Sequence, residues 1–196
     1  MGSDPAPFFA NLFLYFYESK WLKELKRIDL SRARRFGNTF RFIGDLIAIN
    51  DGDEFERCFR DIYPSELELI KENVGSLDAT FLDLELSIID RKFNIKLFDK
   101  RDAFPFAIVR MPFILSNMPS TIFYSSIGAE ILRISRASNN VDHFILASQT
   151  LLRRMISQGA KHLRLVRVLK KTYGRHTLNF SHIASDATIF VTKLLD

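Results

Sequence analysis

The sequence predicts an α+β fold in which an antiparallel sheet with packed helices is followed by a helical subdomain. Three observations predict it. Apolar residues alternate with polar ones in several short segments between residues 39 and 97, whereas residues 120–195 show helical spacing. The charge also changes: residues 1–110 carry 17 Lys and Arg against 19 Asp and Glu, net −2, and residues 111–196 carry 11 against 4, net +7. We therefore expect two subdomains that meet near residue 110.

The composition is that of a folded protein, with 47% hydrophobic residues among 196. The single cysteine, Cys58, excludes an intrachain disulfide, so we expect an intracellular protein, nuclear or cytoplasmic. The acidic start of the chain is untypical of a signal peptide, and the apolar stretch 8–17 is about half as long as a bilayer requires. A membrane partner is therefore not expected, and no Cys/His spacing indicates a metal site.

The first expected element is a helix over residues 6–28, which begins with prolines that lack an N–H the first helical turn does not need. Phe9, Phe13 and Phe16 follow helical spacing within it, so we expect these side chains in the core. The arginine-rich segment 32–38 that follows should be a charged loop.

A β-hairpin is expected over residues 39–50, because two apolar runs flank Gly44-Asp45, a pair typical of tight turns. A short helix should follow, capped by Asp53 and ended by Pro64.

Three further strands are expected from alternation. The first places Leu67 and Leu69 between charged residues. The other two cover residues 82–88 and 93–97, and the short connection 90–92 predicts an antiparallel hairpin with one buried face. The apolar positions of this hairpin are expected in the core.

The spacing of apolar residues becomes helical near residue 120. Polar residues, Gly159 and Gly174 separate the helical segments. The expected helices cover residues 120–137, 141–158, 160–173 and 181–195.

Four segments in this order resemble the back part of retroelement reverse transcriptases. Residues 1–7, MGSDPAP, before a Phe/Leu-rich helix, resemble the nucleotide-pocket motif G-x-P-M-G-S-x-x-[AS]-P. Residues 42–45, FIGD, stand where the family has aromatic-x-Asp-Asp on a β-turn. Residues 81–102 are similar to the ribbon that supports the primer terminus, and residues 169–176, LKKTYGRH, to a K-K-F-[YF]-G-R-[HY] run of animal, Penelope-like elements. The resemblance implies a partial polymerase palm over residues 1–110 and a thumb-like subdomain after it.

The resemblance also implies template-directed DNA synthesis, in which two Mg²⁺ ions activate the primer hydroxyl and stabilise the leaving pyrophosphate. Gly44 stands at the position of the first turn Asp and supplies no metal ligand. Asp45 remains, either as a vestigial catalytic and metal-binding residue or as an ordinary turn Asp. Because the chain also begins at a motif found mid-protein in the family, we expect a truncated chain that neither holds Mg²⁺ productively nor polymerises alone.

By the same resemblance, Gly2 and Ser3 belong to the nucleotide pocket, although their place at a free chain end favours the interpretation that they are frayed. The resemblance further requires the Gly44-Asp45 tip to lie close to the start of the first helix, with a sheet beneath it.

The basic second half predicts a polyanionic partner. Arg164, Arg167 and Lys171 fall at i, i+3 and i+7 on one helical face. The expected nucleic-acid-binding residues are Lys100, Arg101, Arg153, Arg154, Lys161, Arg164, Arg167, Lys170, Lys171 and Arg175. They either contact the backbone of an RNA or DNA duplex, with a strong dependence on salt, or form a solvated helix face.

Three functions remain open from the sequence. The chain is a fragment of a reverse transcriptase (RNA-directed DNA polymerase), a non-catalytic nucleic-acid-binding protein, or a functionless relic of a retrotransposon whose incomplete sheet exposes apolar edges. Nothing in the sequence indicates the oligomeric state.

Overall fold

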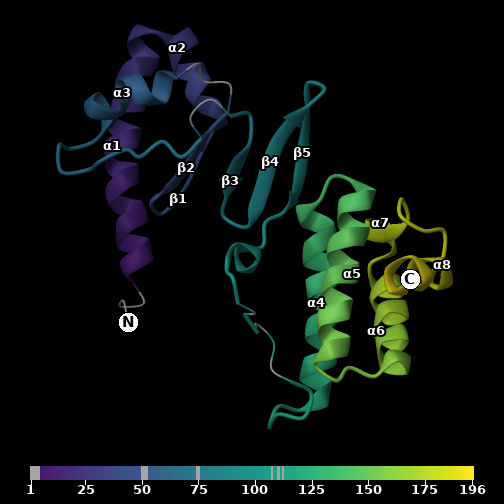
Figure 1. Ribbon diagram of the computed structural model, residues 1–196. Helices are drawn as coiled ribbons and strands as arrows, with labels where there is room; N and C mark the ends of the chain where they lie inside the picture. The colour runs from purple at the N-terminus through teal and green to yellow at the C-terminus, as the bar shows by residue number, and fades with distance from the viewer. Residues whose placement is uncertain (1–4, 50–52, 74–75, 107, 110, 112) are drawn as a thin grey trace. The chain divides into compact units, whose positions relative to one another are not determined.

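A computed structural model describes residues 5–49, 53–73, 76–106, 108–109, 111 and 113–196, with the backbone alone at 102 and 103 (Figure 1). The chain forms two compact units, residues 1–76 and 77–196. Both contain helices and antiparallel strands, so the predicted α+β class is confirmed.

The first unit is built around one long helix and one hairpin. β1 and β2 pair antiparallel from Thr39–Ala48 to Phe42–Asp45, as predicted. The elements are α1 (Ala6–Ile28), α2 (Leu30–Arg35), the 3₁₀ turn η1 (Phe36–Asn38), β1 (Thr39–Phe42), β2 (Asp45–Ala48) and α3 (Glu54–Ile62).

The core of this unit is small and aromatic. Its buried side chains come from α3 and the residue after it, and are Phe55, Cys58, Phe59, Ile62 and Tyr63. One face of α1 covers them through Leu14, Tyr17 and Trp21, and Leu46 and Ala48 of β2 cover them from the hairpin. The predicted amphipathic helix and the hairpin therefore share this core.

The opposite face of α1 contradicts the sequence prediction. Phe9, Phe13 and Phe16 were expected in the core, but they are 60%, 48% and 60% exposed. Helical spacing identifies two apolar faces here, and the hairpin and α3 cover only the one that contains Leu14 and Trp21.

The segment expected to be a charged loop contains the helix α2. Asp29 starts it, because its carboxylate accepts a hydrogen bond from the Arg32 N–H at 2.9 Å. An Asp three residues before the arginine run was the sequence signal for this helix.

The strand expected at Leu67 and Leu69 is absent, since residues 67–71 form no ladder. The α3 side chain Arg60 donates to the carbonyl oxygens of Ser65 and Leu67, at 3.2 and 2.9 Å. Lys71 in turn pairs with Asp53 and Glu56 of the same region. Side chains of one helix thus hold this segment, which periodicity cannot reveal.

The second unit begins with a meander of three strands in the order β3-β4-β5, namely β3 (Ala79–Phe81), β4 (Leu84–Ile89) and β5 (Lys92–Leu97). The predicted β4–β5 hairpin is confirmed, with Asp90 and Arg91 both at positive φ, as a two-residue turn of this hand requires. Leu82 lies in a turn at φ 58°, so the strand expected from residue 82 begins at Leu84.

The apolar side chains of this hairpin are less buried than predicted. None of Leu84, Leu86 and Ile95 reaches full burial, and Leu82 and Phe93 are exposed. A three-stranded sheet packed on one side by two helix ends leaves much of its surface open.

Five helices follow the meander within the described part of this unit, besides the 3₁₀ turn η2 (Lys100–Ala103). They are α4 (Ser120–Ala137), α5 (Val141–Ser157), α6 (His162–Arg175), α7 (Thr177–Phe180) and α8 (Ala187–Leu195). The first three match the prediction. The helix expected over 181–195 is shorter, because Asp186 caps α8 by accepting from the N–H groups of Thr188 and Ile189.

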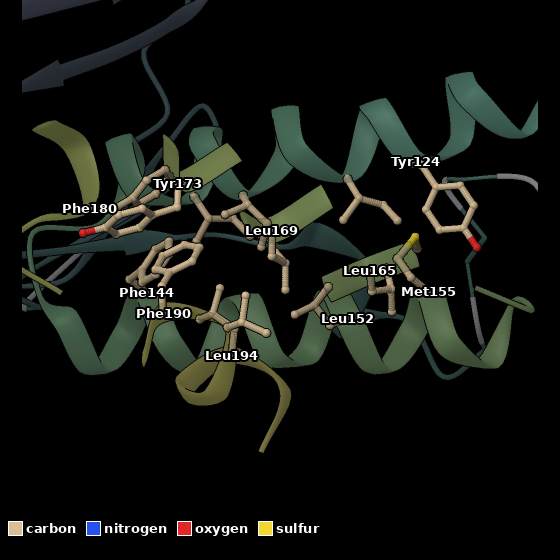
Figure 2. Packing of buried hydrophobic residues seen from close by; sticks show 14 of the residues in the cluster. Tyr124, Phe144, Leu152, Met155, Leu165, Leu169, Tyr173, Phe180, Phe190 and Leu194 are labelled. Carbon is tan, nitrogen blue, oxygen red and sulfur yellow. The ribbon is translucent and has the colours of Figure 1, made fainter. Parts of the chain in front are cut away.

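The helices enclose an apolar core to which rings contribute strongly (Figure 2). Phe180 and Phe190 lie 4.7 Å apart between ring centroids, and Tyr173 donates its hydroxyl to the Ala184 carbonyl. Gly128 allows α4 and α6 to approach closely, since a Cβ there would lie 2.7 Å from Thr172 Oγ1. This core positions α6 with one face buried and one in solvent.

The expected subdomain boundary near residue 110 lies inside the second unit. Asn139, between α4 and α5, exchanges hydrogen bonds with Ile95 and donates to the Phe93 carbonyl at 2.7 Å. The β-meander is thereby bonded to the helices, and the division into compact units comes at residue 76.

Candidate nucleic-acid interface

The tip of the β1–β2 hairpin is held against the second turn of α1. The Ile43 N–H donates to Asn11 Oδ1 at 3.2 Å, and Arg41 donates to the same oxygen at 2.7 Å. Arg41 also pairs with Glu18 at 2.6 Å, and Glu18 accepts a hydrogen bond from the Tyr63 hydroxyl. The Gly44-Asp45 tip therefore lies close to the start of the first helix, as the resemblance requires.

The backbone of this tip does not require glycine at position 44. In this turn the residue with a positive φ is Ile43, at 55°, and Gly44 does not have a positive φ. A Cβ added at Gly44 would meet nothing within 4 Å. An Asp at this position would thus fit, so the absence of the first carboxylate is not imposed by the turn.

Asp45 is exposed at the start of β2, opposite Phe42 in the ladder. No group of three His, Cys, Asp or Glu side chains that could hold a metal ion occurs among the residues that the structure describes. Gly2 and Ser3, the predicted pocket residues, lie outside the described residues.

The most distinct charged surface belongs to α6. Five of its residues are basic and exposed, and the helix contains no Asp or Glu: the cations are Arg164, Arg167, Lys170, Lys171 and Arg175. None of them makes an ion pair with any residue that the structure describes. Leu165, Leu169, Thr172 and Tyr173 bury the other side of the helix.

We call Arg164, Arg167, Lys171 and Arg175 the α6 stripe. Their spacings of three, four and four residues place them on one side of the helix. The stripe runs about 16 Å along the axis, a length over which duplex DNA carries on the order of ten phosphate charges. The sequence-based expectation of one basic face here matches the exposure of these side chains.

One end of the stripe is fixed. The Arg164 guanidinium donates to Ser120 Oγ at 3.2 Å and lies over the Tyr124 ring, 5.5 Å from its centroid. Lys161, just before the helix, is exposed, and its backbone N–H donates to the Tyr124 hydroxyl at 2.8 Å. The start of α6 is therefore docked on α4, and the Lys161 side chain extends the cationic surface.

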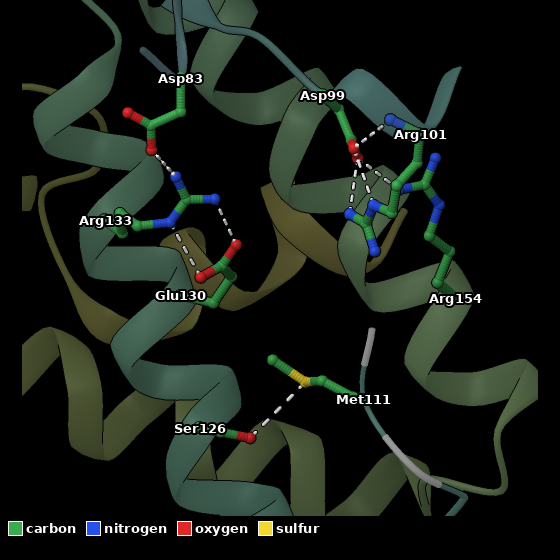
Figure 3. Close-up of polar contacts among 8 residues, drawn as sticks. All are labelled: Asp83, Asp99, Arg101, Met111, Ser126, Glu130, Arg133 and Arg154. Atoms are coloured by element: carbon green, nitrogen blue, oxygen red, sulfur yellow. Dashed lines mark hydrogen bonds and ion pairs between the residues drawn. The ribbon is translucent and has the colours of Figure 1, made fainter. Parts of the chain in front are cut away.

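Two predicted contact residues are engaged elsewhere (Figure 3). Arg101 holds both oxygens of the Asp99 carboxylate, at 2.7 and 2.6 Å, and Arg154 donates to one of them at 2.8 Å. Hydrogen bonds from Arg101, reinforced by Arg154, hold the pKa of Asp99 well below its usual range. In this structure the Asp99 carboxylate therefore neutralises part of the charge of Arg101 and Arg154, two of the residues predicted to bind nucleic acid.

A hollow of about 660 Å³ lies beside this cluster, and Arg101 and Arg154 form part of its wall. Phe104, Phe106 and Met155 supply apolar wall elsewhere. With both cations bound to Asp99, the hollow presents mainly apolar surface. Lys100 and Arg153 are exposed, and neither makes an ion pair within the described part of the chain.

A second group of cations lies on α1, where the sequence shows a basic tail over residues 19–27 to which no binding role was assigned. Lys20, Lys23, Lys26 and Arg27 are exposed, and none makes an ion pair with a described residue. The net charge of −2 over residues 1–110 concealed them, because 19 acidic residues, Glu18 and Glu24 of α1 among them, outnumber the 17 basic ones. The run of cations at the end of the helix was the available signal.

No described helix combines the length and the apolar character needed to cross a bilayer. Comparison with protein-family models, curated proteins and solved structures finds no match to this chain. The resemblance to reverse transcriptases therefore stays a prediction from the sequence motifs.

Proposed function

We propose that this chain is a reverse-transcriptase-related protein that does not polymerise and that binds the backbone of a nucleic-acid duplex through the α6 stripe. The observation that carries the proposal is a helix with five exposed cations, no acidic residue and no ion pair to a described residue. Arginine and lysine of this kind release counterions when they meet phosphates, which gives sequence-independent affinity.

The hairpin supports the polymerase relationship without supplying its chemistry. The tip at Gly44 and Asp45 is bonded to the second turn of α1 through Asn11. Two Mg²⁺ ions need several oxygen ligands in one place, and Gly44 contributes none. Binding is thus the activity that the exposed side chains favour.

A salt titration tests the binding. Anisotropy of a labelled 20-base-pair RNA–DNA hybrid should report an affinity whose logarithm falls linearly with the logarithm of salt concentration. Replacing Arg167, Lys171 and Arg175 with Ala should reduce the slope by about 2.7, since each phosphate contact contributes about 0.9. Arg164 is left unchanged because its guanidinium also packs on Tyr124.

The matched control replaces Lys20, Lys23 and Arg27 of α1 with Ala, which changes the net charge by the same amount. This variant should keep the slope of the unmodified chain. An equal loss in both variants would mean that net charge alone attracts the duplex, and no binding at about 50 mM salt would leave the relic interpretation in place. Both results contradict the proposal.

The second expectation concerns position 44. A Gly44→Asp variant should fold normally, because a side chain there meets nothing within 4 Å. It should still fail to extend a primed RNA template with Mg²⁺ and nucleotides, because two carboxylates on one turn lack the strand carboxylate that completes the family's metal site. Extension by the unmodified 196-residue chain would refute the non-catalytic assignment.

A further inference from the structure

The exposed face of α1 carries two kinds of side chain in separate halves. Spacings of four, three, four, three and four residues place one line of residues along the helix: Phe9, Phe13, Phe16, Lys20, Lys23 and Arg27. All six are exposed. We call this line the α1 stripe, and it is aromatic over its first half and cationic over its second.

Neighbouring exposed residues extend the same division. Phe8, Leu12 and Tyr15 are 65%, 51% and 60% exposed beside the aromatic half. Lys26 and one acidic residue, Glu24, are exposed beside the cationic half, which keeps an excess of positive charge. The opposite side of α1 is occupied by Asn11 and Glu18, which hold the hairpin, and by buried Leu25. The stripe is therefore the side of α1 that no described residue covers.

We infer that the α1 stripe binds the surface of an anionic phospholipid bilayer. Phenylalanine, tyrosine and leucine side chains gain free energy at the boundary between head groups and acyl chains, and lysine and arginine are attracted to anionic head groups. The α1 stripe has aromatic side chains at one end and cations at the other, which is the arrangement that a helix tilted into a bilayer surface needs. The aromatic half enters the interface while the cationic half remains at the level of the head groups.

The dimensions fit this arrangement. Phe9 and Arg27 are separated by 18 residues, or about 27 Å along the axis. An aromatic end buried by 5–10 Å then requires a tilt of about 10–20°. This is contact with one leaflet, which needs no membrane-spanning segment. The inference departs from the sequence-based expectation of no membrane partner, and it does not depend on the proposed binding by α6.

A single-stranded nucleic acid fits the stripe less well. Every nucleotide carries both a base and a phosphate, so a protein that stacks bases and pairs phosphates interleaves its aromatic and basic residues. Along the α1 stripe they are segregated into consecutive stretches of about 10 Å each. Segregation along the axis matches the layers of a bilayer, where apolar and anionic regions are also separate.

Flotation with vesicles tests the inference. The full chain is mixed with vesicles of phosphatidylcholine, or of phosphatidylcholine with about 30% phosphatidylserine, and centrifuged on a density gradient. We expect the chain to float with the anionic vesicles and much less with the neutral ones. Flotation separates membrane binding from aggregation, because aggregated protein sediments.

Two triple variants address the two halves of the stripe. Lys20, Lys23 and Arg27 replaced with Gln should weaken binding to anionic vesicles by roughly 100-fold, at about fivefold for each cation. Phe9, Phe13 and Phe16 replaced with Ser should abolish flotation on both kinds of vesicle while leaving the circular dichroism spectrum unchanged. The Arg167, Lys171 and Arg175 variant of α6 serves as the matched control and should float like the unmodified chain.

Several results would overturn the inference: no flotation, equal flotation on neutral and anionic vesicles, or flotation unaffected by either α1 variant. A dimer that depends on the phenylalanines, without flotation, would assign the stripe to a second copy of the chain. Binding of single-stranded RNA that the phenylalanine variant loses, without flotation, would assign it to nucleic acid. A failure here leaves the salt titration at α6 unchanged, so the two proposals fail separately.

Discussion

Gly159 ends α5 in a conformation that other residues avoid. Its φ is 96°, its N–H donates to the Ile156 carbonyl, and the next N–H, of Ala160, donates to the Met155 carbonyl. This pair of bonds is the Schellman motif of helix ends. The sequence predicted the interruption at Gly159 correctly, and it predicted a helix end just before Gly174, whereas α6 continues through Gly174 to Arg175.

The two glycines give opposite predictions for replacement by alanine. Gly159→Ala should lower the free energy of unfolding by about 1–3 kcal/mol, because the φ is unfavourable and the new Cβ would lie 2.7 Å from Ile114 Cγ2. Gly174→Ala should raise it by about 0.5–1 kcal/mol, since Gly174 is helical and has open space around it. Urea denaturation of both variants checks this. Similar changes in the two would refute the distinction.

The residue type alone did not determine which cationic side chains are available to bind a phosphate. Arg101 and Arg167 look alike in the sequence, yet the first is bound to Asp99 and the second is exposed without an ion pair to any described residue. The sequence places Arg101 two residues from an Asp, which was a usable signal. The approach of Arg154, 55 positions away, was not predictable, because it depends on how α5 packs on the segment after β5.

At the scale of elements, the ionic cluster at Asp99 joins the end of β5 to α5. The folded-state pKa of Asp99 is depressed. Its contribution to stability is therefore present above the unfolded pKa of about 3.9 and is lost as the pH falls through the lower folded value. This cluster should contribute to acid sensitivity of the second unit.

The Asp99→Asn variant should be less stable than the unmodified chain by about 1.5–3 kcal/mol above pH 5, the range for hydrogen bonds to a charged group. The difference should shrink as the pH falls below the unfolded pKa of about 3.9 towards 2, because the carboxyl is then protonated in the unfolded state while the folded state keeps its charge. Chemical denaturation across this pH range measures it. Asp83→Asn, which disturbs an exposed pair with Arg133, is the control and should cost less than about 1 kcal/mol. A constant difference at all pH values would contradict the assignment.

Elements that follow from the local spacing of their residues could be predicted from the sequence. Elements held in place by distant side chains could not. The helix over 120–137 and the turn at Asp90 and Arg91 follow from local spacing. The segment 67–71 alternates like a strand, but the guanidinium of Arg60 takes the carbonyl oxygen of Leu67 that a ladder would use. The α1 helix was predictable, whereas which of its two apolar faces is buried depends on the rest of the unit.

For the whole molecule, the two units differ in core size. Among described residues, the buried apolar cluster of the second unit has 18 members and that of the first has 5. A small core leaves little free energy beyond the conformational entropy that folding costs. We therefore expect two unfolding transitions, with residues 1–76 unfolding first.

A fragment of residues 77–196 tests this division. It should fold cooperatively, reproduce the more stable transition of the full chain, and retain the salt-dependent duplex binding of the α6 stripe. Calorimetry and the anisotropy titration measure these properties. If the fragment were unfolded, or if the full chain unfolded in one transition, the units would not be independent.

The position of the single tryptophan gives the first unit an optical signal of its own. The only tryptophan, Trp21, is half-buried in the first unit, with its ring 4.9 Å from that of Phe36. Emission excited at about 295 nm therefore reports on residues 1–76 alone. Near-ultraviolet ellipticity should come from both units, because Phe59 and Tyr63 pack in the first and Tyr173, Phe180 and Phe190 in the second. In an unlabelled sample, a transition that appears in this ellipticity and not in tryptophan emission therefore belongs to the second unit.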